Sequence, residues 1–188
     1  MGKEPTREAC CGQGRATFAR FPSSTLATEQ NKAVFLGEAT RTLDQRFRLS
    51  LPEDMAERLV AGSSECLIAK ERRGCLSLWN REHWEEHQRQ AAEILKGKLA
   101  SGRLERRLAD VQRLGRLLST RQRVTAIAGR GRLVIPEGFR ELLAVEPGGS
   151  VNVVGAAVCV ELWHPEAWAD HLAEALPGYR DLYEDLVS

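Results

Sequence analysis

Two short segments of this 188-residue chain each place a pair of arginines around a tight turn. The first turn carries Arg46 and Arg48, and the second carries Arg130 and Arg132. A guanidinium binds a phosphate or the edge of a guanine through two parallel hydrogen bonds, and a two-stranded β-ribbon fits the major groove of DNA. On extended backbone, a spacing of two residues puts both arginines of a pair on the same side. These four side chains are therefore the candidate DNA contacts.

The two turns differ in the residue that could orient the second arginine of the pair. Asp44 lies four residues before Arg48, close enough for a local salt bridge, whereas Ala128 stands at the corresponding place before Arg132. We therefore expect Arg48 to contribute more to DNA binding than Arg132. The alternative is that Arg48 is a structural residue whose only role is to pair with Asp44.

The turns belong to an internal repeat, because the chain matches itself without gaps at a shift of 84 positions. Such self-similarity is typical of a duplicated structural unit. The matching pairs include Arg48/Arg132, Leu49/Leu133, Pro52/Pro136, Glu53/Glu137, Glu57/Glu141, Leu59/Leu143, Cys75/Cys159, Leu78/Leu162, Trp79/Trp163, Glu82/Glu166, Trp84/Trp168 and His87/His171.

Each copy predicts the same series of elements. A β-rich run enters the arginine turn, a short apolar strand follows, and a proline stands at the start of a short helix. A hairpin comes next, after which Asn80 and His164 each begin an amphipathic helix. The predicted segments are Val34 to Leu43 and Val124 to Ala128, Arg48 to Leu51 and Arg132 to Ile135, Glu53 to Val60 and Glu137 to Leu143, and Glu65 to Trp79 and Ser150 to Trp163.

A unit of about 45 residues buries too little surface to be stable alone. The two copies are therefore expected to pack together about a pseudo-two-fold axis, giving a mixed α+β fold with a β-barrel core. The predicted organisation is an N-terminal extension at 1–32, a first unit at 33–84, a helical linker at 85–121, a second unit at 122–172 and an acidic tail at 173–188.

The linker is apolar on one side and rich in arginine on the other. Leu104, Leu108, Val111, Leu114 and Leu118 recur at helical spacing. We expect a packing helix with a solvated basic face, and direct contact of that face with phosphates is the alternative. Glycines 97 and 102 are expected to divide the region into two helices, with residue 101, a serine, as an N-cap.

The net charge of +1 conceals a strong asymmetry. Residues 88–123 hold ten Lys and Arg against three Asp and Glu, whereas residues 137–188 hold two Arg against ten Asp and Glu. A basic centre of this kind suits a polyanionic partner. No apolar run of about 18 residues exists and the N-terminus lacks a signal-peptide core, so we expect a cytoplasmic protein.

The sequence offers little support for an enzyme, a metal site or a cofactor. His83 and His87 fit the His-x-x-Glu-His string of inverted zinc proteases, but Ala167 replaces the first histidine in the second copy. Cys10 and Cys11 lack partners at zinc-ligand spacing. No glycine-rich phosphate loop or nucleophile–base pattern is present, and the five cysteines are expected to be reduced thiols.

In combination, these motifs resemble the MraZ family. The resemblance is carried by Leu43-Asp44-x-x-x-Arg48-Leu49-Ser50-Leu51-Pro52, by Gly-x-Gly-Arg-Leu-x-Ile-Pro at 129–136, and by Glu161-Leu162-Trp163 followed by Trp168. It covers roughly residues 33–172. It implies two tandem swapped-hairpin units of the AbrB/SpoVT type and a ring-like homo-oligomer. It also implies a nucleoid-associated repressor of the division and cell-wall gene cluster that binds promoter repeats through its hairpin arginines.

Three features depart from the family pattern. Ala128 replaces the second aspartate, Phe47 replaces the glycine that usually precedes the first motif arginine, and the extension at 1–32 has no counterpart. Phe47 could contact a thymine methyl group or fold back onto the barrel. These departures keep a second function open, namely an antitoxin-like protein-interaction module with weak or no DNA binding.

Overall fold

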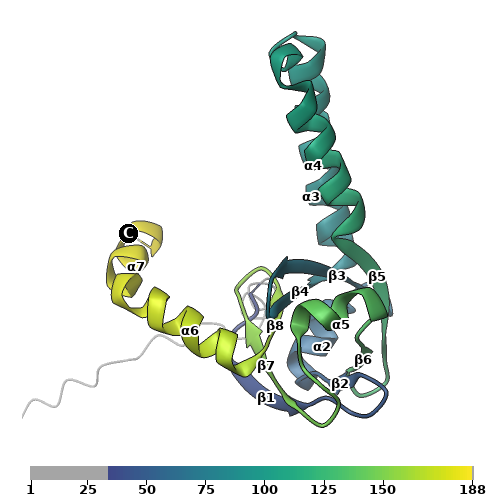
Figure 1. Cartoon of the computed structure of the whole chain (residues 1–188), viewed down its shortest axis with the longest axis vertical. Coiled ribbons are helices and arrows are strands. Elements are labelled where there is room, and N and C mark those ends of the chain that lie inside the picture. The colour runs from purple at the N-terminus through teal and green to yellow at the C-terminus, as the bar shows by residue number, and fades with distance from the viewer. Residues whose placement is uncertain (1–33, 188) are drawn as a thin grey trace, which may run out of the picture. The chain divides into compact units, whose positions relative to one another are not determined.

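The computed structural model describes residues 34–187, so the N-terminal extension, with Cys10 and Cys11, lies outside the described residues. Eight strands, six α-helices and two 3-10 helices follow one another along this part of the chain (Figure 1). In order they are β1 (Glu38–Thr42), β2 (Arg48–Ser50), α2 (Glu53–Leu59), β3 (Glu65–Arg72), β4 (Cys75–Asn80), α3 (Arg81–Ala100), η1 (Glu105–Arg107), α4 (Leu108–Thr120), β5 (Gln122–Ala128), β6 (Arg132–Val134), α5 (Glu137–Leu143), β7 (Ser150–Gly155), β8 (Val160–Trp163), α6 (Pro165–Ala175), η2 (Leu176–Gly178) and α7 (Tyr179–Val187).

All eight strands form one antiparallel sheet in the order β1-β7-β8-β4-β3-β5-β6-β2. The strands at its two ends, β1 and β2, are joined by the first arginine turn, so the sheet nearly closes into a barrel. The first strand of each copy pairs with the hairpin of the other copy: β1 with β7, and β5 with β3. This exchange is the swapped-hairpin arrangement that the resemblance implied, and the predicted α+β barrel fold is confirmed.

The pseudo-two-fold axis can be located from the strand register. Leu49 pairs with Leu133 between β2 and β6, and Ser77 pairs with Glu161 between β4 and β8. Both pairs join positions that are 84 residues apart, so each pair lies on the axis. Two reciprocal hydrogen bonds flank the first pair, from Ile135 N to the Phe47 carbonyl at 2.9 Å and from Leu51 N to the Gly131 carbonyl at 3.0 Å.

The core fills the barrel between the strands and the short helices α2 and α5, around which the strands curve (Figure 1). Leu49 and Leu133 are fully buried at its centre, and Met55 on α2 and Phe139 on α5 are buried against the strands. The shape of the barrel therefore depends on apolar residues supplied by both copies.

The helices that leave the barrel begin where the sequence predicts. The Asn80 side chain accepts a hydrogen bond from His83 N at 3.1 Å at the start of α3, and the ring of His164 accepts one from Glu166 N at 3.2 Å at the start of α6. Each bond satisfies a backbone N–H group that the first helical turn leaves free.

The linker differs from its prediction at two positions. α3 runs through Gly97 without a break, since one glycine costs a helix only about 1 kcal/mol and the surrounding residues favour helix. Ser101 ends α3 as its C-cap, with its hydroxyl donating to the Lys98 carbonyl, and so does not begin the next helix. The chain turns at Gly102, which has a φ of +71°.

The three cysteines in the described part of the chain are free thiols in the core, namely Cys66, Cys75 and Cys159. Burial raises the pKa of Cys66 and of Cys159 to about 12, and it raises the pKa of Cys75 as well. Because only the thiolate reacts readily, we predict that these three thiols resist iodoacetamide at pH 8 until the protein is unfolded. Peptide mapping by mass spectrometry checks this prediction, and rapid alkylation of any of the three in the native protein would contradict it.

Candidate nucleic-acid interface

The β2–β6 ribbon presents one face to the core and one to solvent. Leu49 and Leu133 point inward and are buried. Arg48 pairs with Val134, and Ser50 pairs with Arg132. Since directly paired residues and residues two apart share a face of a sheet, these four side chains lie together on the outer face.

The first turn is held by the Asp44 carboxylate. Its Oδ1 accepts hydrogen bonds from the backbone N–H groups of Arg46 and Arg48, both at 2.8 Å, and its Oδ2 accepts from Arg48 Nε at 2.6 Å. The Arg48 backbone N–H lowers the pKa of Asp44 below its ordinary value, and the Arg48 guanidinium and the Arg46 N–H act in the same direction. The carboxylate therefore stays charged at neutral pH and orients Arg48 through its Nε, so both Nη groups of Arg48 remain available.

The second turn has no such anchor, because Ala128 replaces the aspartate. Its conformation comes instead from Arg130 and Gly131, which have φ values of +62° and +69°. Within residues 34–187, the side chains of Arg46, Arg130 and Arg132 form no ion pair. All three are exposed.

Phe47 folds back onto the barrel, which decides between the two roles open to it from the sequence. Its ring packs against the core cluster, and the Arg140 guanidinium lies over it at 4.1 Å from the ring centroid. Its φ of +55° corresponds to that of Gly131 in the second copy, so one left-handed position carries a phenylalanine in one turn and a glycine in the other.

The left-handed position of the second turn has less room for a side chain than the equivalent position of the first turn, which holds Phe47. A Cβ atom on Gly131 would lie 3.0 Å from Ala56 Cβ and 3.1 Å from the Leu51 carbonyl oxygen, and Ala56 occupies the position that Arg140 holds in the other copy. We predict that Gly131→Phe lowers the free energy of unfolding by about 1–3 kcal/mol. Urea denaturation checks this value, and an unchanged midpoint would show that the turn relaxes freely.

The structure places Arg48 and Arg132 on one ribbon and Arg46 and Arg130 in the turns before its strands, and it changes their relation within each pair. Arg46 and Arg130 lie in the turns, and a residue with positive φ separates each from the strand arginine that follows. The alternation of an extended strand therefore does not apply within a pair. Ser50 and Val134 complete the outer face, and finding them from the sequence would have required the strand register.

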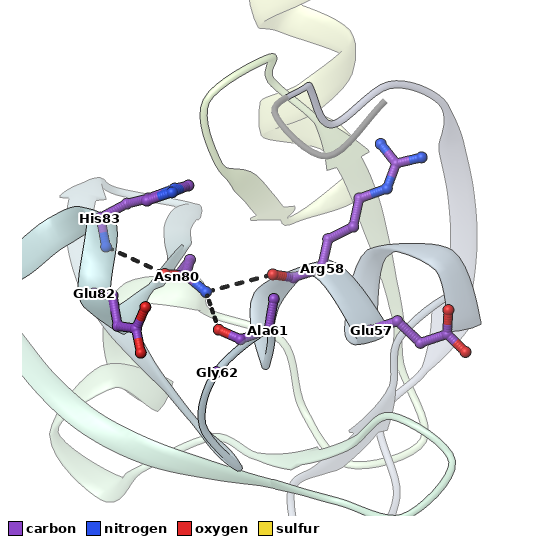
Figure 2. A pocket seen from close by; sticks show the side chains of 7 residues that line it. All are labelled: Glu57, Arg58, Ala61, Gly62, Asn80, Glu82 and His83. Carbon is purple, nitrogen blue, oxygen red and sulfur yellow. Dashed lines mark hydrogen bonds between the residues drawn. The ribbon is translucent and has the colours of Figure 1, made fainter. Parts of the chain in front are cut away.

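The two histidines of the His-x-x-Glu-His string, His83 and His87, lie beside Asn80 and Trp84 respectively. Figure 2 shows the backbone nitrogen of His83 hydrogen-bonded to Asn80, with its imidazole directed away from Glu82. His87 lies beside the Trp84 ring, with centroids 6.4 Å apart. Among residues 34–187, no cluster of three or more His, Cys, Asp or Glu side chains is arranged to hold a metal ion.

The hollow beside His83 is built around Asn80, and Figure 2 shows how this side chain joins α3 to the end of α2. The Asn80 amide donates to the carbonyls of Leu59 and Ala61, at 3.1 and 3.0 Å, while its oxygen caps α3. Its polar atoms are thus occupied by the chain itself. Asn80 acts as a structural clamp between two elements of the first copy.

The interleaved strands of the two copies give this barrel the fold of tandem swapped-hairpin units of the AbrB type. No helix among residues 34–187 has the length and apolar character needed to span a membrane. No family model matches the chain.

Individual relatives are more informative. The chain is 28% identical over 155 residues to the transcriptional regulator MraZ of Heliobacterium modesticaldum, a match that covers 82% of this chain and 97% of the relative. MraZ of Syntrophomonas wolfei is 26% identical and MraZ of Leuconostoc mesenteroides 27% identical, each over 154 residues with the same coverage. These relatives confirm the resemblance to the MraZ family, and the match extends over nearly their whole length.

Proposed function

We propose that this protein is a DNA-binding transcriptional regulator that contacts its operator through the outer face of the β2–β6 ribbon. The observation that carries the proposal is that Arg48 and Arg132 share the outer face of this ribbon, with Arg46 and Arg130 in the turns that lead into its two strands. Of these four arginines, only Arg48 is engaged by a carboxylate. The names of the relatives, all transcriptional regulators, support the same conclusion.

The ribbon suits a groove of DNA in both shape and charge. Its two strands have the width that the major groove admits, and Arg48 and Arg132 lie at opposite ends of a three-residue ladder. Val134 is exposed directly opposite Arg48 and offers an apolar contact to a thymine methyl group. Arg46 and Arg130 extend the positive surface at each turn toward the phosphates.

The proposal extends to assembly and target. The units at 33–84 and 122–172 supply the ribbon, while the linker at 85–121 and the tail at 173–188 serve assembly. A homo-oligomer, such as the ring implied by the resemblance, would present several ribbons to repeated DNA sites. Because the ribbons are linked, each bound ribbon raises the effective concentration of the next. Repression of a division and cell-wall gene cluster is the role that the resemblance implies.

Fluorescence anisotropy with a labelled duplex from the region upstream of the protein's own gene tests this function. We expect that duplex to bind about a thousandfold or more tightly than a scrambled duplex of equal length. Equal affinity for the two duplexes would contradict sequence-specific regulation.

The second candidate is the antitoxin-like interaction module, which the missing aspartate at Ala128 favours. Affinity purification of the protein at high and low salt separates the two functions. Retained DNA at low salt supports the regulator. A stoichiometric protein partner that survives high salt, with no retained DNA at low salt, would support the module.

A further inference from the structure

The C-terminal helix α7 exposes an apolar stripe. Tyr179, Leu182, Tyr183 and Leu186 recur at positions i, i+3, i+4 and i+7, and each is more than half exposed. No residue of α7 is buried. A nine-residue helix is too short to be stable in water by itself. The stripe is therefore a surface that another surface must cover if α7 is to persist.

The helical linker exposes a second apolar surface. Neither α3 nor α4 has a buried residue. Val111 and Leu118 are half-buried, whereas Leu114 and Leu117 are each 45% exposed along one flank of α4. The rest of the chain thus covers only part of the apolar side of α4, and the flank with Leu114 and Leu117 is free to accept a partner.

The two surfaces carry opposite charge. The segment 165–187 has six acidic residues and one arginine, whereas the segment 103–121 has six arginines and two acidic residues. Asp185 lies three residues after Leu182 and so borders the stripe on α7. Arg113 lies four residues before Leu117 and so borders the flank on α4.

We propose that the acidic α7 of one copy docks on the basic flank of α4 of a second copy, with the Leu182 and Leu186 side of α7 against Leu114 and Leu117. Two different surfaces meet in this contact, so it is heterologous and joins copies head to tail. The proposal builds on the homo-oligomer proposed above and is independent of the contact with DNA.

Charge favours the contact of α7 with α4 over a contact between two α7 helices or between two α4 flanks. Two α7 helices packed together would bring acidic borders side by side, and two α4 flanks would bring arginines side by side. Like charges at such a border destabilise a contact, while unlike charges favour it and fix its register. Docking of α7 on α4 removes both apolar surfaces from water and pairs their charges.

Two double variants of the full chain test the proposal. Leu182→Gln with Leu186→Gln alters only the stripe on α7, and Leu114→Gln with Leu117→Gln alters only the flank on α4. Glutamine keeps the helix propensity of these positions. A control, Gln112→Ala with Arg116→Ala, changes the opposite side of α4. Sedimentation velocity gives the mass of each protein, and far-ultraviolet circular dichroism gives its helix content.

We expect the wild-type chain and the control to assemble, and each double variant alone to have the mass of one chain. An equimolar mixture of the two double variants should then have the mass of two chains, because it retains one intact pair of surfaces. If either double variant assembles alone like the wild type, the contact does not join α7 to α4 and the inference is wrong, although the oligomer stands. A monomeric wild-type chain would overturn both the inference and the proposed oligomer.

If a double variant loses helix content, an exchange of charges tests the same contact. Arg113→Glu and Asp185→Lys leave both apolar surfaces intact. Each alone should weaken assembly about tenfold or more at low salt, and the two together in one chain should restore it. Equal assembly of the single variants and the wild type would contradict a contact in which Asp185 of α7 lies near Arg113 of α4.

Discussion

Replacing Arg48 with alanine should weaken binding to the upstream duplex by roughly tenfold to a hundredfold, since one bidentate arginine contact contributes about 1–3 kcal/mol. Asp44 holds the guanidinium by its Nε, which leaves both Nη groups available and reduces the conformational freedom that is lost on binding. Fluorescence anisotropy at fixed salt measures the change. The free energy of unfolding should change little, because the Asp44–Arg48 pair is partly exposed to solvent.

The second copy supplies the matched control for this prediction. Arg132 lacks an orienting carboxylate, so Arg132→Ala should cost less affinity than Arg48→Ala. Asp44→Ala should reduce affinity by an intermediate amount, because it makes the first turn resemble the second while keeping the arginine. A larger loss for Arg132→Ala than for Arg48→Ala would reverse this ranking.

Replacing Trp163 with alanine should lower the free energy of unfolding by about 3–5 kcal/mol. Its ring is 1% exposed, stacks on His171 with centroids 4.9 Å apart, and lies beneath the Arg72 guanidinium at 5.0 Å. These contacts attach α6 to the barrel. Urea denaturation followed by circular dichroism measures the loss.

Trp79 is the equivalent residue of the first copy and the control for Trp163. It is half-buried and packs against Trp84 with centroids 4.9 Å apart. Trp79→Ala should therefore cost clearly less than Trp163→Ala. Equal losses at the two positions would contradict the assignment of Trp163 as the main anchor of α6.

Much of the fold was predictable because the chain contains two copies of one pattern. The prolines at 52 and 136 and the caps at Asn80 and His164 are local signals, and local signals set element boundaries. The swapped pairing of β1 with β7 came from the family resemblance, since no local signal specifies which strands pair.

The prediction was least complete where tertiary contacts decide conformation. The position of Phe47 depends on Arg140, which is 93 residues away in sequence and stacks on its ring. Ser50 and Val134 join the arginine face through cross-strand register. Gly97 stays within α3 because the helix formers around it outweigh one unfavourable residue.

The salt dependence of DNA binding tests the account most directly. Each phosphate contact adds about 0.9 to the slope of log K against log salt. A variant with alanine at Arg46, Arg48, Arg130 and Arg132 is compared with a control of equal charge that carries glutamine at Lys96, Lys98, Arg103 and Arg106. Our account predicts that the ribbon variant loses about 2 from the slope for each DNA-bound chain, because Arg46 and Arg130 contact phosphates, while the control keeps the wild-type slope. An unchanged slope in the ribbon variant, with a reduced slope in the control, would place the DNA contact on the helical linker instead.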